Sequence, residues 1–229
     1  MNTAIILAGG VGSRMGVDRP KQYLIVKDKP IIAYCLEIFQ NHSAIDKIVI
    51  VVSEEWQDYV EENVAKYGLT KVCGYAPAGR TRQHSIYNGL KCAQDNAPDT
   101  DICIIHDAAR PLVSDKIIND CIVGATEDDG AMPVISVKDT IYQSADGKKI
   151  DNLLKRSELF AGQAPESFKF KEYLDIHNYV SDDEIATTAG SSEIAYRHGM
   201  KIRLVEGSER NFKITTIEDL ETFETIING

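Results

Sequence analysis

The stretch AIILAGGVGSRMG, residues 4–16, begins as a continuous run of apolar residues and then breaks into glycines. Such an apolar run is typical of a strand that is covered on both faces of a parallel sheet. In open parallel sheets, ligands bind beyond the C-terminal ends of the strands. A loop of glycines lets backbone N–H groups come close to a phosphate, although a purely structural turn has the same composition. The stretch therefore predicts an α/β fold with a candidate phosphate loop after its first strand.

The glycines do not match the two most common phosphate loops. A Walker A loop ends in Gly-Lys-Ser or Gly-Lys-Thr, which this stretch lacks. A dinucleotide-binding fingerprint needs Gly-x-Gly-x-x-Gly, but after Gly10 and Gly12 the third glycine, Gly16, comes one residue too late. Two cations accompany the loop instead, because Arg14 lies within it and Lys21 follows in the segment PKQY. Glycines with two nearby cations indicate a clamp for a polyphosphate.

Strand and helix patterns alternate along most of the chain. The predicted strands are residues 3–10, 47–53, 101–108, 131–137 and 201–207. Periodic apolar spacing predicts helices at residues 29–40, 53–68, 85–95, 114–130, 168–180, 191–199 and 217–228. This order predicts a mainly parallel sheet with helices on both faces, joined by right-handed crossovers.

The alternation stops after residue 137. Residues 138–160 contain two short extended pieces on either side of the turn signal Asp146-Gly147, which predicts a hairpin. A chain of 229 residues suits one large domain. We therefore expect a single domain over residues 1–229, from which an arm at about residues 138–162 protrudes.

The composition limits the partners. The chain carries a formal net charge of −10, which argues against a nucleic-acid polymer, although a local basic cluster can still bind a small phosphorylated ligand. No apolar run approaches the roughly 18 residues of a membrane span, and the chain enters a strand pattern without a signal sequence. The five cysteines lie far apart, as expected for reduced thiols. We therefore expect a cytoplasmic protein that binds neither nucleic acid nor membrane.

A second group of polar residues ends the predicted strand at 101–108, in the segment IIHDAARP. Asp107 projects to the same sheet edge as the glycine loop. This position suits a carboxylate that holds Mg²⁺ against phosphates, or alternatively one that caps the following loop. Arg110 is placed to meet a second phosphate. His106 is expected to be a packed or hydrogen-bonded histidine rather than a catalytic one.

Further candidates lie in the segments GRTRQHS and NFKITT. Gly79 permits a tight turn, and Arg82 and Ser85 lie at a helix N-terminus, which favours anions. Lys213 and, in the expected arm, Arg156 are additional cations. Each of these two alone is typical of a surface, so their interest depends on the other segments.

A resemblance to the CTP-dependent polyol-phosphate cytidylyltransferases appears when the segments are taken together. It rests on LAGGVGSRMG, PKQYL, GRTRQHS, HDAARP, VKDT, VEG and NFKITT. The known branches of this family act on 2-C-methyl-D-erythritol 4-phosphate and on ribitol 5-phosphate. The resemblance implies a Rossmann-like nucleotidyltransferase fold, a homodimer and dependence on Mg²⁺. The implied reaction transfers CMP from CTP to the polyol phosphate and releases pyrophosphate.

The resemblance also implies roles for individual residues. The implied catalytic residues are Arg14, Lys21 and Lys213. The implied nucleotide-binding residues are Leu7, Ala8, Gly9, Gly10, Gly12, Gly79, Arg82, Ser85, Asp107 and Ala108, with Asp107 also on the metal side. The implied residues for the acceptor phosphate are Arg110, Thr140 and Arg156, together with Lys213. In the family the arm crosses to the partner subunit, so Thr140 and Arg156 are expected to serve the neighbouring site.

Three positions depart from the family pattern. In GQAPES, Ala164 replaces a threonine whose hydroxyl contacts the substrate. Gly190 stands near the place of a usual aspartate, and Arg80 stands where an aspartate is common beside CTP. The acceptor therefore stays open between ribitol 5-phosphate and 2-C-methyl-D-erythritol 4-phosphate, with arabinitol or glycerol phosphate as further candidates. A UTP-dependent sugar-phosphate nucleotidyltransferase and a non-catalytic nucleotide-binding protein are the alternative functions.

Overall fold

The computed structural model of the protein describes residues 1–10 and 19–229. Within these residues, eight strands form the main sheet. They are β1 (Asn2–Leu7), β4 (Lys47–Val52), β5 (Val72–Pro77), β6 (Ile102–Asp107), β7 (Gly130–Ser136), β10 (Phe160–Gly162), β11 (Glu166–Lys169) and β12 (Ile202–Glu206). The predicted α/β class with a mainly parallel sheet is confirmed.

The order of the strands brings three strand ends together. Strands β6, β1, β4 and β5 are neighbours in this order and run parallel, as do β7 and β12. Strand β11 lies between β6 and β7 and is antiparallel to both, and β10 pairs antiparallel with the end of β7. Leu7 lies in register with Val51 on one side and Asp107 on the other. The C-terminal ends of β1, β4 and β6 therefore meet at one edge.

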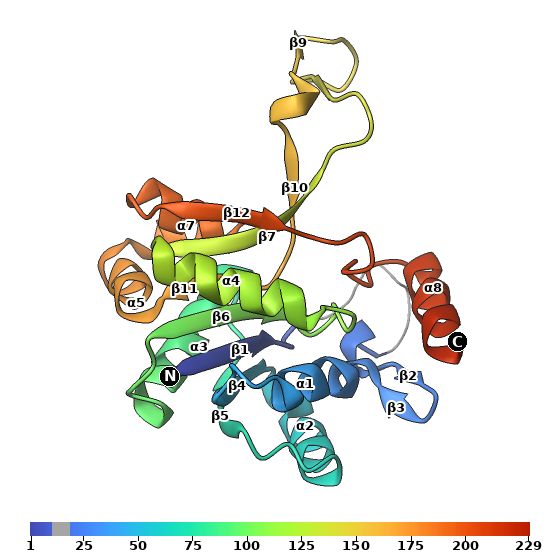
Figure 1. Ribbon diagram of the computed structural model, residues 1–229, viewed down its shortest axis with the longest axis vertical. Coiled ribbons are helices and arrows are strands. Elements are labelled where there is room, and N and C mark those ends of the chain that lie inside the picture. Colours follow the sequence, from blue (N-terminus) through green and yellow to red (C-terminus); the bar gives the residue numbers. More distant parts are fainter. Residues whose placement is uncertain (11–18) are drawn as a thin grey trace.

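Helices cover both faces of this sheet (Figure 1). One face carries α1 (Ile31–Asn41), α2 (Glu54–Lys66) and α4 (Asp115–Glu127). The opposite face carries α3 (Arg82–Asn96), α5 (Phe170–Tyr179) and α7 (Ser191–Arg197), with the short α6 (Asp182–Thr187) beside α3. Leu36 and Tyr173 are examples of the fully buried side chains that fill the two cores. No helix in the described part of the chain is long and apolar enough to cross a membrane.

A third, smaller core supports two loops at the edge where the C-terminal ends of β1, β4 and β6 meet. Helix α8 (Ile217–Asn228) packs against the hairpin of β2 (Ile25–Val26) and β3 (Lys29–Pro30). Phe223 is fully buried there, and Lys27 Nζ donates to the carbonyl oxygen of Ile227 at 2.6 Å. The segments on either side of this core carry Lys21 and Lys213, so α8 and the hairpin help to position both.

The residues between β7 and β11 form the arm, which extends away from the sheet (Figure 1). Strand β8 (Tyr142–Gln143) pairs antiparallel with β9 (Asn152–Leu153), and a 3₁₀ turn (Arg156–Glu158) leads into β10. Gly147 adopts a positive φ of 70°, and Asp146 Oδ1 accepts a hydrogen bond from the Lys148 N–H at 2.8 Å. The hairpin that the Asp146-Gly147 signal predicts is confirmed.

Candidate active site

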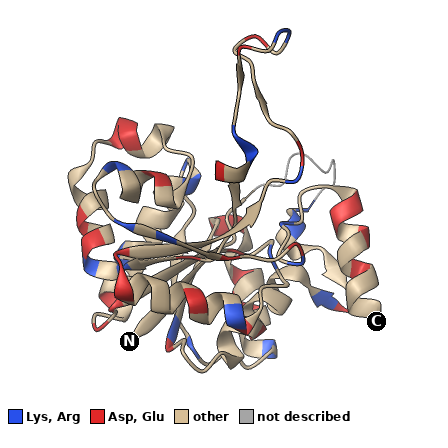
Figure 2. Ribbon diagram, turned by 45° about the horizontal axis from the view of Figure 1, so that its top comes forward, with Lys and Arg blue, Asp and Glu red and all other residues tan. Residues whose placement is uncertain are grey.

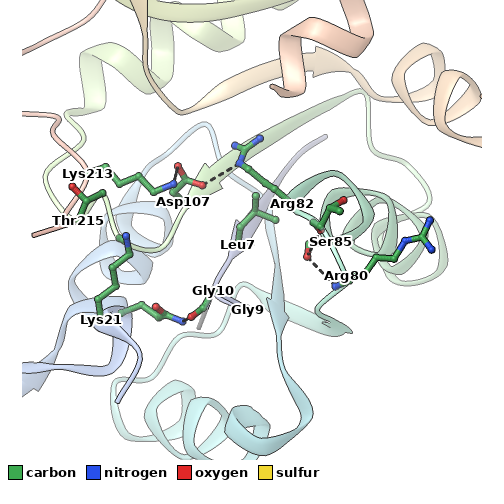
Figure 3. Close-up of a pocket in the computed structure, with 14 residues that line it drawn as sticks. Leu7, Gly9, Gly10, Lys21, Arg80, Arg82, Ser85, Asp107, Lys213 and Thr215 are labelled. Carbon is green, nitrogen blue, oxygen red and sulfur yellow. Dashed lines mark hydrogen bonds and ion pairs between the residues drawn. The ribbon is translucent and has the colours of Figure 1, made fainter. Parts of the chain in front are cut away.

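A cavity of about 460 Å³ opens at the C-terminal edge of β1 and β6 (Figure 3). Its size suits a small-molecule ligand. The residues that line it are Leu7, Gly9, Gly10, Lys21, Gln22, Gly79, Arg80, Thr81, Arg82, Ser85, Asp107, Ala109, Lys213 and Thr215. The loops after β1, β5 and β6 and the segment before α8 therefore converge on one site.

Two glycines allow two of these loops to touch. A Cβ atom on Gly9 would lie 2.3 Å from the Cβ of Ala78, and a Cβ atom on Gly79 would lie 2.7 Å from the backbone nitrogen of Ser85. A side chain at Gly9 would therefore force the two loops apart, and a side chain at Gly79 would push its own loop away from the first turn of α3. Ser85 fixes the second loop, because its Oγ accepts from the Gly79 N–H at 2.9 Å and donates to the Thr81 carbonyl at 3.1 Å.

Asp107 is the only carboxylate among the described lining residues, and cations surround it. Its oxygens lie 2.9 Å from Lys213 Nζ, 3.4 Å from Arg82 Nε and 3.8 Å from Arg110 Nε. Figure 3 shows Lys213 and Arg82 reaching toward it from opposite sides. Burial acts to raise the pKa of Asp107, but the charges of Arg82 and Lys213 outweigh it and hold this pKa well below its usual range. The carboxylate therefore stays ionised throughout the neutral range.

Arg82 connects this carboxylate to the neighbouring strand β11 and to helix α7. Its Nη1 donates to Ser191 Oγ at 2.6 Å, and its Nη2 lies 3.4 Å from Glu166 Oε1. Glu166 is buried in β11, where its Oε2 accepts from the N–H and Oγ of Ser192 at 2.8 and 2.7 Å. Three elements therefore hold the guanidinium: β6, β11 and the first turn of α7.

A second set of contacts joins HDAARP to NFKITT. Arg110 Nη1 donates to the carbonyl oxygen of Asn211 at 2.6 Å, and the Ile214 N–H donates to the Ala109 carbonyl at 2.9 Å. His106 Nε2 lies 3.0 Å from the Arg110 carbonyl oxygen, which can only accept, so Nε2 carries the proton. Burial lowers the pKa of His106 to about 4, and the ring is neutral at pH 7. His106 is thus a buried, hydrogen-bonded histidine, as the sequence predicts.

Most of the sequence-predicted residues come together. The predicted residues that line the cavity are Leu7, Gly9, Gly10, Lys21, Gly79, Arg82, Ser85, Asp107 and Lys213. Ala8 and Ala108 are buried next to lining residues in the sequence. Arg110 does not line the cavity but forms an ion pair with Asp107, which does. Gly12 and Arg14 lie outside the described residues. Thr140 and Arg156 lie on the arm, away from this cavity, where Arg156 Nη1 donates to the Lys138 carbonyl at 3.0 Å.

Several lining residues were not predicted from the sequence. They are Gln22, Thr81, Ala109 and Thr215, together with Arg80, which the sequence marks only as a departure from the family pattern beside CTP. Glu166 joins them through Arg82. All of the lining ones except Thr215 are adjacent to a predicted residue, so a broader interpretation of each motif would have included them. Glu166 gave no such signal, because its strand was not predicted.

The three departures from the family pattern have structural roles here. Arg80 forms an ion pair with Asp182 of α6, and Figure 3 shows its guanidinium directed away from the centre of the cavity. Ala164 is buried and does not line the cavity, and its carbonyl accepts from Asn211 Nδ2 at 2.7 Å. Gly190 is the residue before the first turn of α7. The side chains at these positions therefore do not form the centre of the site.

The charge of the cavity is opposite to that of the chain. Among the lining residues that the structure describes, four are cations: Lys21, Arg80, Arg82 and Lys213. The same lining contains one carboxylate, that of Asp107, whereas the whole chain has a net charge of −10. Figure 2 shows acidic residues on the outer helices, for example along α8. A locally positive cavity in an acidic protein suits a small polyanion.

Known proteins place the chain in a family. The family IspD, described as 2-C-methyl-D-erythritol 4-phosphate cytidylyltransferase, matches residues 2–229. A ribitol-5-phosphate cytidylyltransferase from Streptococcus agalactiae is 37% identical, over 100% of this chain and 96% of that protein. A 2-C-methyl-D-erythritol 4-phosphate cytidylyltransferase from Clostridium novyi is 40% identical, over 100% of this chain and 97% of that protein.

Solved structures agree on the fold. The 4-diphosphocytidyl-2C-methyl-D-erythritol synthase of Anaerococcus prevotii superposes with a TM-score of 0.84 at 23% identity, over 100% of this chain and 96% of that one. The 2-C-methyl-D-erythritol 4-phosphate cytidylyltransferase of Francisella tularensis gives a TM-score of 0.80 at 26% identity, over 98% of each chain. With the family match and both relatives covering nearly the whole chain, the protein belongs to the IspD family of cytidylyltransferases.

Proposed function

We infer that this chain transfers CMP from CTP to a polyol phosphate and releases pyrophosphate. The observation that carries this conclusion is the convergence of Lys21, Arg82 and Lys213 on one cavity, beside the backbone of Gly9 and Gly10. Membership of a cytidylyltransferase family gives the reaction type. The positive charge of the cavity complements the negative charge of both substrates.

The chemistry needs no general base. The attacking group is a phosphate monoester, whose second pKa is about 6, so most of it is already a dianion at pH 7. Its oxygen attacks the α-phosphorus of CTP in line, and the bond to pyrophosphate breaks. The lining residues agree with this scheme, because the hydroxyl of Ser85 is used within its own loop. Cations that stabilise the charge on the leaving group supply the catalysis.

The sequence-predicted roles become a proposal for this site. The nucleotide contacts Leu7, Ala8, Gly9, Gly10, Gly12, Gly79, Arg82, Ser85, Asp107 and Ala108. Arg14 and Lys21 stabilise the triphosphate as it reacts, and Lys213 orients the reacting phosphates. Arg110 and Lys213 hold the acceptor phosphate. The proposal for Gly12 and Arg14 rests on the sequence alone, since both lie outside the described residues.

A divalent metal is part of the proposal, with Mg²⁺ as the ion. Within residues 1–10 and 19–229 there is no cluster of three or more His, Cys, Asp or Glu side chains for a metal. The donor chemistry nevertheless fits Mg²⁺, which commonly takes one carboxylate together with substrate phosphates and water. Asp107 is the residue that would hold it. When bound, the ion would act as a Lewis acid and neutralise charge on the triphosphate.

The acceptor proposed here is ribitol 5-phosphate or 2-C-methyl-D-erythritol 4-phosphate. Relatives with both names match this chain over its full length at 34–40% identity. A polyol phosphate of either kind presents the same dianionic phosphate to Arg110 and Lys213. The two acceptors differ in their hydroxyl groups, so contacts with these groups determine which one is used. A panel of acceptors tests the choice directly.

We further propose a homodimer that forms through the arm. The arm exposes four large apolar side chains, Tyr142, Ile150, Leu153 and Phe160, each at least 48% exposed. Apolar groups that are exposed in this way are typical of an interaction surface. In such a dimer the arm would bring Thr140 and Arg156 to the acceptor side of the neighbouring cavity.

A cytoplasmic location completes the proposal. The reaction consumes CTP, a nucleotide of the cytoplasm. The five cysteines are all free thiols in the structure, which is ordinary for a reducing compartment.

A thermal-shift panel of CTP, UTP, ATP and GTP with Mg²⁺ tests the nucleotide. Ligands that bind the folded state raise the melting temperature by mass action. We expect CTP to give the largest increase. A larger increase with UTP would point to the UTP-dependent alternative. Strong binding of CTP without turnover on any acceptor would point to a non-catalytic nucleotide-binding protein.

A further inference from the structure

Gln22 is the one neutral amide side chain among the described residues that line the cavity, and it contacts the backbone of the glycine loop. It is 3% exposed, and its Nε2 donates to the carbonyl oxygens of Ala8 and Gly10 at 2.6 and 2.8 Å. The opposite orientation of the amide would put Oε1 against two carbonyl oxygens, so the chemistry fixes which atom points at the loop. Both protons of the Gln22 amide are therefore used on the backbone of residues 8–10.

Tyr23 adds a third contact to the same loop. Its hydroxyl donates to the Ala8 carbonyl at 2.9 Å. The ring is fully buried and stacks on Trp56 with 4.6 Å between the ring centroids, and it meets the edge of Tyr59 at 5.6 Å. This packing holds the hydroxyl in place. The Ala8 carbonyl thus has two rigid donors, one from each of two adjacent residues.

These contacts orient the backbone N–H group of Gly9. In a trans peptide the carbonyl and the next N–H point in opposite directions, so fixing the Ala8 carbonyl also fixes the Gly9 N–H. The N–H of Ala8 already donates to the Val51 carbonyl at 2.7 Å. No acceptor within the described residues is bonded to the N–H of Gly9 or Gly10. Both of these glycines line the cavity, where such groups suit phosphate oxygens.

We propose that Gln22 is a positioning residue for the nucleotide, which sets the backbone of residues 8–10 for the triphosphate and fixes Lys21 relative to it. Gln22 and Lys21 belong to the same 3₁₀ turn, Lys21–Tyr23, so the amide that holds the loop also sets the distance from the loop to the cation. This inference rests on the proposed function, because it takes CTP as the ligand. It goes beyond that function by giving one side chain control of nucleotide affinity.

Gln22→Glu is the sharpest test, because it keeps the size and replaces the donor with a carboxylate facing two carbonyl oxygens. We expect the KM for CTP to rise by about 10- to 100-fold, as for loss of buried hydrogen bonds with an unsatisfied partner. The KM for the acceptor should change much less. Lowering the pH should reduce the defect relative to the unaltered protein, since protonation of the introduced carboxylate restores one donor.

Two further variants keep the test decisive. Gln22→Met removes the donor without adding charge, so it should raise the KM for CTP less than Gln22→Glu does, and it serves if Gln22→Glu does not fold. Asn63→Asp is the matched control, because Asn63 is a buried amide that donates to the Tyr59 carbonyl at 2.7 Å, away from the cavity. It should lower the melting temperature without changing the KM for CTP.

The outcomes separate this inference from the proposed function. If the unaltered protein does not turn over CTP with any polyol phosphate, the function fails. If it does, but Gln22→Glu and Gln22→Met leave the KM for CTP within twofold, the positioning role is wrong. The role is also wrong if both variants raise the two KM values equally and without dependence on pH, which is the signature of general destabilisation.

Discussion

Individual side chains at the cavity act mainly as charges whose positions other residues fix. Lys213 and Arg82 share Asp107, and Arg82 is held in turn by Glu166. Removing one of these charges leaves its partners without compensation. The effect is substantial, because ion pairs in partly buried sites contribute more free energy than exposed ones. Variants at these positions should therefore lower both the stability of the fold and the catalytic rate.

Lys21→Ala should lower the rate of pyrophosphate release by on the order of 10²-fold, as for removal of one electrostatic donor to a transition state. The same substitution at Lys66, an exposed residue of α2, is the matched control and should leave the rate unchanged. The assay is pyrophosphate release at saturating CTP and acceptor. Normal turnover by Lys21→Ala would show that the catalytic assignment of Lys21 is wrong.

Asp107→Asn tests the carboxylate proposed for the metal. The amide keeps the shape but loses the charge, so the Mg²⁺ concentration that gives half the maximal rate should increase by about tenfold or more. Asp120→Asn in α4 changes a carboxylate that pairs with Lys116, outside the cavity, and should not shift the Mg²⁺ requirement. An unchanged requirement in Asp107→Asn would remove Asp107 from the metal site.

The sequence predicts this part of the site well for a physical reason. Glycines and charged residues at strand ends, or in the loops that follow them, leave strong local signals, and Gly9, Gly79, Lys21 and Asp107 line one cavity as expected. Glu166 could not be found in this way. Its role comes from contacts with residues far along the chain, which no local pattern contains.

The secondary-structure elements show the same limit. Long elements with clear periodicity, such as α2 and α4, are predicted with ends shifted by a few residues. Strand β5, strand β11 and helix α6 were not predicted. Strand β5 contains Gly74 and ends at Pro77, which are depleted in strands. The other two span four and six residues, too few for a period to be recognised.

Mixing two inactive variants tests the role proposed for the arm. Lys21→Ala lacks a residue of the cavity, and Arg156→Ala lacks a residue of the arm. If the arm serves the partner's site, subunit exchange between them should restore activity to about a quarter of all sites, because half of the dimers are mixed and each has one intact site. Activity that stays absent after confirmed exchange would place Arg156 in its own subunit's site.

For the molecule as a whole, two buried histidines should limit stability in acid. Burial lowers the pKa of both His106 and His177 to about 4, whereas in the unfolded chain each titrates near 6.5. The unfolded state therefore binds protons first, and stability is lost as the pH falls from about 6.5 through 4, by up to about 3 kcal/mol for each histidine.

Thermal melts from pH 8 to pH 4 check this expectation. The melting temperature should be nearly constant above pH 7 and decrease steadily below pH 6.5. His177 lies in the core, where its Nε2 accepts from Gln83 Nε2 at 2.7 Å, so His177→Gln should flatten part of the decrease. If the melting temperature of His177→Gln decreases with pH as steeply as that of the unaltered protein, groups other than His177 cause the acid sensitivity.

The central claim is the transfer of CMP to a polyol phosphate, and one assay measures it directly. The protein is incubated with CTP, Mg²⁺ and, separately, ribitol 5-phosphate, 2-C-methyl-D-erythritol 4-phosphate, arabinitol phosphate or glycerol phosphate. Pyrophosphate and the CDP-polyol are then quantified together. We predict that ribitol 5-phosphate or 2-C-methyl-D-erythritol 4-phosphate gives both products in equal amounts and that no pyrophosphate forms without an acceptor. Absence of pyrophosphate with every acceptor, or faster turnover when UTP replaces CTP, would contradict the account.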